Sequence, residues 1–456
     1  MDDAWTGFEV AFYRVVERFV REAGKLPLVP VQVPRWEFAG NGRFQYVRTP
    51  VFWTDQSLGM LMPHWEEFIE LDVCARQSHL VNYMNVMVGG SGIRVAFDLV
   101  SFTLGTIGDA LRTTASSVDF DSTMVRTRLS LLRQAINDEN VETEILILID
   151  GVQLEDDVDL GDGLSVRCAD AVTMTKFLQT GMLPAFDSEN TPTIERPDNE
   201  WVVLRKAYLE PKVVGRAPGA RVFRGSASEV AAIEFERFAD ALAVMRGRRP
   251  RLVGWLERLS NEALSRSWSS GTSAGRARAP AILSSPDAGR IRSIWHGVDA
   301  VSKFPKAKAV AMAVRRMGFA SMRERWEDRF LDVMIALEAL LLSDPSPERG
   351  ELRFRMAFRA AQSLPNGVGD FTSGEIFIAM KHAYDVRSAL AHGGDANGGE
   401  VFNIRGRKIS LEALLGLVSE IGRSLTESAI EAVLRDKRYF IDWEGQLTAY
   451  FDLKRK

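Results

Sequence analysis

The chain has 456 residues, 46% of them hydrophobic and 26% charged, and its net charge is −4. Because single hydrophobic cores stop growing at about 250 to 300 residues, this length predicts two or three domains, and the near-neutral charge means that any polyanion must bind a local basic surface. The only cysteines, Cys74 and Cys168, are too few for a disulfide scaffold and fit a reducing cytoplasm.

Residues 1–225 have a pattern of strands and loops, interrupted by helical patches such as Val125 to Ile136. Glu144 to Asp150 is a short apolar run that ends at a turn, and Leu164 to Cys168 alternates polar and apolar residues after Gly161-Asp-Gly163. Further strand candidates are Gln32 to Phe38 and Arg43 to Val47. We expect a mixed, β-rich N-terminal domain.

Residues 226–324 change to a helical period and predict a helical connector. The apolar residues that recur on one side of a helix are Val230, Ile233, Phe238, Ala241, Leu242 and Met245. Ser, Gly and Arg then dominate residues 265–280, which predicts a flexible linker or long surface loop near 265–290.

Arginines are concentrated between Met245 and Arg292. This segment has ten arginines and three acidic residues, a local charge balance of +7. The arginines are Arg246, Arg248, Arg249, Arg251, Arg258, Arg266, Arg276, Arg278, Arg290 and Arg292. Such a run either forms a surface that binds the phosphates of a nucleic-acid backbone or is a solvated loop in a chain that is rich in arginine throughout. We favour the second interpretation.

Residues 325–445 predict a bundle of four helices joined by short loops. The first spans Arg325 to Ser343 and the second Glu351 to Leu364, where Pro365-Asn-Gly follows. The third opens with the capping-box pattern Thr372-Ser-Gly-Glu375 and reaches His392-Gly-Gly394, and the fourth runs from Ser410 to Asp436. Together with the N-terminal half, the bundle predicts the α+β class.

No secretory signal or membrane span is visible in the sequence. Acids follow Met1 where a signal peptide has basic residues, and the apolar run from Val333 to Leu342 is interrupted by Glu338 and shorter than the ~20 residues of a span. We therefore expect a cytoplasmic protein without a membrane partner.

Arg387 and His392 are the strongest candidates for chemistry. Gly393-Gly394 is a natural helix stop, so His392 falls in the last turn, where unpaired carbonyls favour a protonated imidazole. A fixed cation and a titratable imidazole are sufficient to cleave a phosphodiester without a metal. The two residues lie about 140° apart on an ideal helix, so they converge on one ligand only with a bend or a partner chain. A two-fold homodimer that joins two such helices would place two arginines and two histidines in one cleft.

The spacing alone is weak support. With 45 arginines and 5 histidines, an arginine separated from a later histidine by four to six intervening residues is expected roughly 1.5 times by chance. A second match is Arg290 with His296, which lies beside the Ser/Gly-rich segment and outside the predicted bundle. From spacing alone, a helix-terminal His preceded by an Arg is more often a capping or surface residue.

Three blocks of sequence resemble the Apea-like branch of the HEPN superfamily: Phe330 to Leu342, Gly350 to Ala361 and Tyr384 to Gly394. The resemblance covers about residues 325–440. It implies an all-α HEPN bundle that dimerises, with a metal-independent endoribonuclease site built from the Arg-x4-6-His motifs of both protomers, in which Arg387 and His392 occupy the motif positions. It also implies RNA as the substrate and a role as an antiphage or toxin-like effector, with a phage-derived or host trigger recognised by the N-terminal domain. The alternative is a non-catalytic HEPN module that binds RNA, a nucleotide or a protein partner.

Two positions depart from this family pattern, and one acid is a further candidate for the site. Ser388 stands where many HEPN nucleases have Asn, Asp or His, although its hydroxyl can still donate to a phosphate. Gly394 stands where toxins controlled by adenylylation have a tyrosine, so we do not expect that control. Glu338 lies on the flank of an apolar helix face and either orients Arg387 through a bidentate pair or is a solvated helix residue.

The sequence contains no P-loop, G-x-G-x-x-G, H-E-x-x-H or Cys/His cluster. Nucleotide hydrolysis, dinucleotide chemistry and zinc sites therefore have no sequence basis, and we expect neither a cofactor nor a metal.

Overall fold

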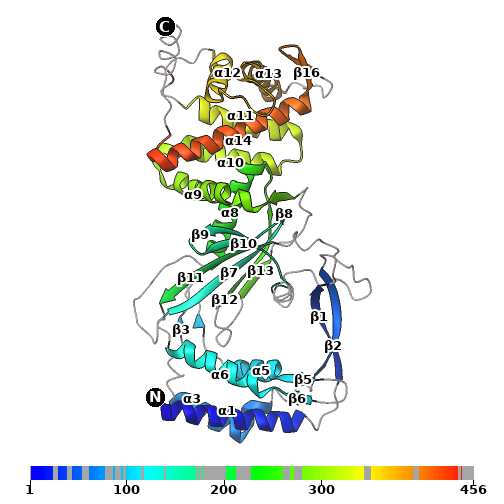
Figure 1. Ribbon diagram of the computed structural model, residues 1–456, viewed down its shortest axis with the longest axis vertical. Coiled ribbons are helices and arrows are strands. Elements are labelled where there is room, and N and C mark those ends of the chain that lie inside the picture. The colour runs from blue at the N-terminus through cyan, green and yellow to red at the C-terminus, as the bar shows by residue number, and fades with distance from the viewer. Residues whose placement is uncertain are drawn as a thin grey trace. The chain divides into compact units, whose positions relative to one another are not determined.

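The computed structural model describes residues 2–23, 29–38, 44–53, 61–77, 86–87, 94–95, 99–113, 118–137, 140–170, 173, 177, 202–211, 227–259, 268–271, 280–343, 351–393, 400–439 and 443. These residues form helices and a mostly antiparallel sheet, so the chain belongs to the mixed α+β class, as expected. It divides into two compact units (Figure 1). Unit 1 comprises Met1–Ile149, Asp162–Ala232 and Leu252–Gly275, and unit 2 comprises Asp150–Gly161, Ile233–Arg251 and Arg276–Lys456.

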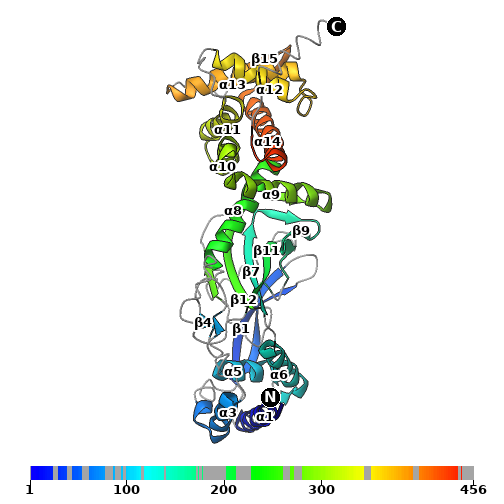
Figure 2. The same cartoon turned by 90° about the vertical axis from the view of Figure 1, so that its left-hand side faces the viewer.

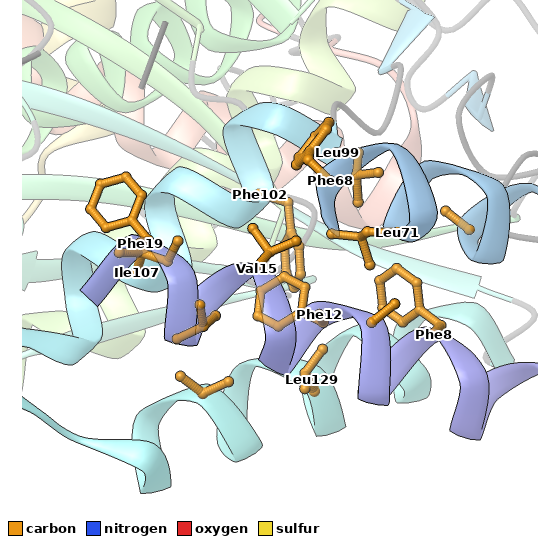
Figure 3. Close-up of a cluster of buried hydrophobic side chains, with 14 of the residues drawn as sticks. Phe8, Phe12, Val15, Phe19, Phe68, Leu71, Leu99, Phe102, Ile107 and Leu129 are labelled. Carbon is orange, nitrogen blue, oxygen red and sulfur yellow. The ribbon is translucent and has the colours of Figure 1, made fainter. Parts of the chain in front are cut away.

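Four helices of unit 1 enclose an apolar core (Figure 3). They are α1 (Asp2–Ala23), α3 (Glu66–Gln77), α5 (Leu99–Ala110) and α6 (Ser122–Asn137). Phe8, Phe12, Val15 and Phe19 recur every three or four residues along α1, which places them on one face, and all are buried. The rings of Phe12 and Phe102 lie 5.6 Å apart between centroids.

These helices correct one expectation. The prediction of mainly strands and loops does not hold for α1, α3 and α5, and only α6 coincides with a predicted helical patch. The 4-3-4 spacing of apolar residues in α1 was the available signal. Packing of that face against three other helices, rather than residue propensity, decides the conformation.

The strands of unit 1 follow the predicted positions more closely. The hairpin of β1 (Val29–Phe38) and β2 (Phe44–Trp53) contains both of the early strand candidates. A sheet contains β13, β12, β7, β11 and β10 in that order, with antiparallel pairing from β7 through β11 to β10. Their bounds are Asn140–Asp150 (β7), Leu164–Cys168 (β10), Val202–Pro211 (β11), Arg251–Leu259 (β12) and Trp268–Gly271 (β13). Two short hairpins, Val86–Met87 with Arg94–Val95 (β3, β4) and Leu111–Thr113 with Val118–Phe120 (β5, β6), complete the described strands of this unit.

Unit 2 is mainly helical. Its long helices are the last part of α8 (Ala227–Arg246), then α9 (Ala288–Lys303), α10 (Lys308–Met322), α11 (Trp326–Leu341), α12 (Leu352–Ser363), α13 (Ser373–Ala391) and α14 (Leu411–Asp436). It also has the parallel pair β8 (Val152–Leu154) and β14 (Ala281–Leu283), strand β9 (Val158–Gly161) against α9, and the hairpin β15 (Val401–Ile404) with β16 (Arg407–Ser410).

The bundle is built from paired helices. α10 packs along α11, α12 packs along α13, and α14 contacts α9, α10, α11 and α13. Figure 2 shows α12, α13 and β15 together at the end of unit 2 opposite α9. The buried apolar faces of α11 and α14 supply most of the core here, including Phe330, Leu337, Leu414 and Ile421. α13 is therefore held on one side by α11 and α14 and on another by α12.

The four helices predicted for residues 325–445 are confirmed within one or two residues at each end. The sequence analysis missed the hairpin β15–β16, whose turn uses positive φ at Arg405 and Gly406. The flexible loop expected near 265–290 lies partly outside the described residues, and residues 268–271, 281–283 and 288–290 of it are in β13, β14 and α9.

Candidate functional site

Helix α13 has a defined start and end, which together position Arg387 and His392. At its start the Thr372 side chain accepts a hydrogen bond from the Glu375 backbone N–H, and Glu375 accepts one from the Thr372 backbone N–H at 2.9 Å, the predicted capping box. At its end His392 is the C-cap, and Gly393 follows with φ +74°, a conformation that favours glycine. The predicted stop is therefore confirmed, although Gly394 lies outside the described residues.

Arg387 contacts Glu338 across the bundle, from α13 to α11. Nη2 of Arg387 donates a hydrogen bond to Oε2 of Glu338 at 3.2 Å, and Nε lies 3.0 Å from Oε1. The buried Nε–H makes no hydrogen bond, so the contact expected as bidentate is one hydrogen bond and one close charge contact. Side-chain exposures of 32% for Arg387 and 25% for Glu338 leave part of the guanidinium accessible to a ligand.

His392 is exposed at the helix end. Its backbone N–H lies 3.2 Å from the carbonyl oxygens of Ser388 and Ala389, which fixes the backbone of the last turn while leaving the imidazole free to meet another molecule. Ser388 is half-buried one position after Arg387. The elements of the predicted site in this chain are thus an arginine paired with Glu338 and an exposed histidine, both in the last two turns of α13.

The second Arg/His pair lies in a different environment. Arg290 of α9 donates from Nε and Nη2 to the two carboxylate oxygens of Glu427 of α14, each at 2.6 Å. Glu427 raises the pKa of Arg290 through this hydrogen bond. The His296 ring packs edge-on against Trp295, 4.8 Å between centroids. Arg290 makes two hydrogen bonds to its acid, whereas Arg387 makes one to Glu338. His296 is partly buried against Trp295, whereas His392 is exposed, and these differences favour Arg387 and His392 as a site.

Most described arginines of the run between Met245 and Arg292 are paired with acids from distant parts of the chain. Arg246 pairs with Asp287, Arg249 with Glu236 and Asp240, Arg251 with Asp150, Arg290 with Glu427 and Arg292 with Asp159. The side chains of Arg258, Arg266, Arg276 and Arg278 lie outside the described residues. The local balance of +7 therefore overstates the basic surface, because every one of these acids except Asp287 lies outside the run and is not counted in that balance.

The sequence analysis also missed a buried carboxylate. Asp332 of α11, with a side chain 5% exposed, accepts hydrogen bonds from Arg316 at 2.7 Å and Arg323 at 2.8 Å. The available signal was an acid on the apolar face between Phe330 and Val333. These two hydrogen bonds link α10 to α11, so Asp332 has a structural role. It lies in the same helix as Glu338.

Among the residues that the structure describes, no group of three or more His, Cys, Asp or Glu side chains is arranged to hold a metal ion. No helix in this described part has the length and apolar character needed to cross a bilayer. Comparisons with protein-family models, with curated proteins and with solved structures found no match.

Proposed function

We propose that residues 325–440 form a HEPN-type domain and that the protein is a metal-independent endoribonuclease whose site is shared between two protomers. The observation that carries the proposal is the arrangement on α13: a partly accessible Arg387 tied to Glu338 and an exposed His392 at a glycine-terminated helix end. Arg387 makes one hydrogen bond to its acid, whereas Arg290 makes two to Glu427, and the His392 side chain is exposed.

The proposed reaction uses the 2′-hydroxyl of RNA as nucleophile. One protomer's His392 accepts the 2′-hydroxyl proton while oxygen attacks phosphorus, and the second His392 protonates the departing 5′-oxygen. The products are a 2′,3′-cyclic phosphate and a 5′-hydroxyl end. The guanidinium groups of both Arg387 side chains hold the phosphate oxygens as charge develops on them, and the Ser388 hydroxyl adds a donor one residue away.

The dimer is required by this chemistry. On an ideal helix Arg387 and His392 point about 140° apart, so one helix does not present both to one phosphate. When a two-fold axis relates two copies of α13, each copy contributes one Arg387 and one His392 to the cleft that holds the phosphate. In this proposal the N-terminal domain, residues 1–225, recognises a phage-derived or host trigger and controls the bundle. Cleavage of RNA then halts the infected cell.

Cleavage of labelled single-stranded RNA by the full chain in EDTA tests the proposal. We expect cleavage by the wild type and a loss of about 10²-fold or more for His392→Ala, because general acid–base groups contribute that much. His296→Ala is the matched control, since His296 also follows an arginine in a helix, and it should cleave at the wild-type rate. Equal cleavage by wild type and His392→Ala rejects the site, and a dimer that binds RNA without cutting it indicates the non-catalytic module instead.

A further inference from the structure

Unit 2 contains an open pocket of about 400 Å³ away from Arg387 and His392. It lies between α10, α11, α14 and the residues that follow α8. Met317, Val333 and Leu415 form its apolar lining. The charged lining consists of four arginines and one acid: Arg246, Arg248, Arg329, Arg423 and Glu412. Arginine side chains thus surround an apolar patch large enough for a small organic ligand, because such pockets typically have about 300 to 1,000 Å³.

Three of the four arginines make no ion pair and no side-chain hydrogen bond within the described residues. Arg246 is paired with Asp287, whereas Arg248, Arg329 and Arg423 have neither an ion pair nor a side-chain hydrogen bond there. Arg290, another arginine of unit 2, is by contrast paired with Glu427. The pocket therefore has four arginines and a single acid, Glu412, in its lining.

Arg423 is the most enclosed of these cations. Burial, the largest cause, lowers the pKa of its guanidinium; Glu420 raises it and Arg290 lowers it further. A Cβ at Gly247 would come within 2.7 Å of Nη1 of Arg423, so the glycine, with φ +64°, is what admits the guanidinium beside the end of α8. A half-buried cation without a hydrogen-bonding acceptor is costly, and a bound anion would offset that cost.

We propose that this pocket binds a small phosphorylated ligand of nucleotide size, with Arg423, Arg329 and Arg248 on the phosphates and the Met317, Val333 and Leu415 side chains against the organic part. Arginine suits this role because its planar guanidinium donates two parallel hydrogen bonds to phosphate oxygens. The volume favours a free ligand over a polymer. This site is separate from the proposed ribonuclease site and does not rest on it.

Isothermal titration of the full chain with ADP, pyrophosphate and adenosine tests the proposal. We expect ADP and pyrophosphate to bind and adenosine not to bind, with ADP tighter than pyrophosphate because the apolar lining adds contact. Arg423→Gln and Arg329→Gln should each weaken ADP binding at least about tenfold, the usual effect of losing a hydrogen bond to a charged group. His392→Ala should leave ADP binding unchanged, which separates this site from RNA cleavage.

Gly416→Phe is a second test that keeps every arginine. Gly416 lines the pocket from α14, and a Cβ added there meets no atom within 4 Å, so a larger side chain enters open space and blocks the ligand. Gly7→Phe in α1 is its matched control, because Gly7 is also an exposed helical glycine with no atom within 4 Å of an added Cβ. We expect Gly416→Phe to abolish ADP binding and Gly7→Phe to retain it. No binding of ADP or pyrophosphate at millimolar concentration, or equal binding by wild type, Arg423→Gln and Gly416→Phe, overturns the proposal.

Discussion

Nη2 of Arg387 donates to Oε2 of Glu338 at 3.2 Å, and this hydrogen bond links α13 to α11 beside an exposed His392. The acid lies 49 residues before the arginine in the sequence, and the packing of α11 against α13 brings the two together. A carboxylate in this position restricts the rotamers of Arg387 while leaving Nη1 without a hydrogen bond to any described residue. Glu338 is thus a positioning residue in the proposed mechanism.

Glu338→Gln should slow RNA cleavage by about tenfold, because a neutral amide holds the guanidinium less firmly. The free energy of unfolding should fall by less than about 1 kcal/mol, since both side chains are a quarter to a third exposed and such pairs contribute little. Single-turnover cleavage and chemical denaturation measure the two effects. Glu427→Gln breaks an Arg–Glu pair of the same bundle and should not change cleavage; wild-type cleavage by Glu338→Gln would remove Glu338 from the site.

Asp332→Ala should destabilise the protein by about 3 kcal/mol, near the lower end of the range for breaking a buried ion pair. The carboxylate is 5% exposed, but its partners Arg316 and Arg323 are 30% and 46% exposed and can regain water. Urea unfolding measures the change. Asp385→Asn, which removes one charge from the exposed pair with Arg353, is the control and should cost less than about 1 kcal/mol. Equal effects of the two variants would contradict a structural role for Asp332.

The stability of the protein should depend on pH through Asp240. Burial raises the pKa of Asp240 from 3.8 to about 6, against the opposing charges of Arg249 and Arg315. Between these values the folded state binds a proton that the unfolded state releases, so the stability that Asp240 contributes is complete below pH 4 and is lost as pH rises to about 6.

The loss should amount to about 2 to 3 kcal/mol, since one pKa unit corresponds to about 1.4 kcal/mol. Measuring unfolding free energies of wild type and Asp240→Asn from pH 4 to 8 tests this. The wild type should lose stability relative to the variant up to about pH 6 and remain parallel to it above pH 7. A constant difference over the whole range would show that Asp240 ionises normally in the folded state.

Local patterns predicted the C-terminal helices well because each carries its own signals. The capping box at Thr372, the glycine after His392 and the apolar spacing of α11 and α14 act within a few residues, so α11 to α14 begin and end close to the expected positions. The strands β7 and β10 were predictable for the same reason. α1 was missed although its 4-3-4 spacing was visible, because the surrounding residues favour strands and loops.

The sequence by itself determined which residues stand at helix ends and which faces are apolar, and therefore where Arg387 and His392 lie along α13. Only the tertiary structure decided the partners of the arginines: Glu338 for Arg387, Glu427 for Arg290, and no ion pair within the described residues for Arg423. The physical reason is the separation along the chain over which each kind of interaction acts. Helix caps and periodic apolar faces depend on neighbours within about one or two turns, whereas an ion pair forms between side chains that packing brings together from distant segments.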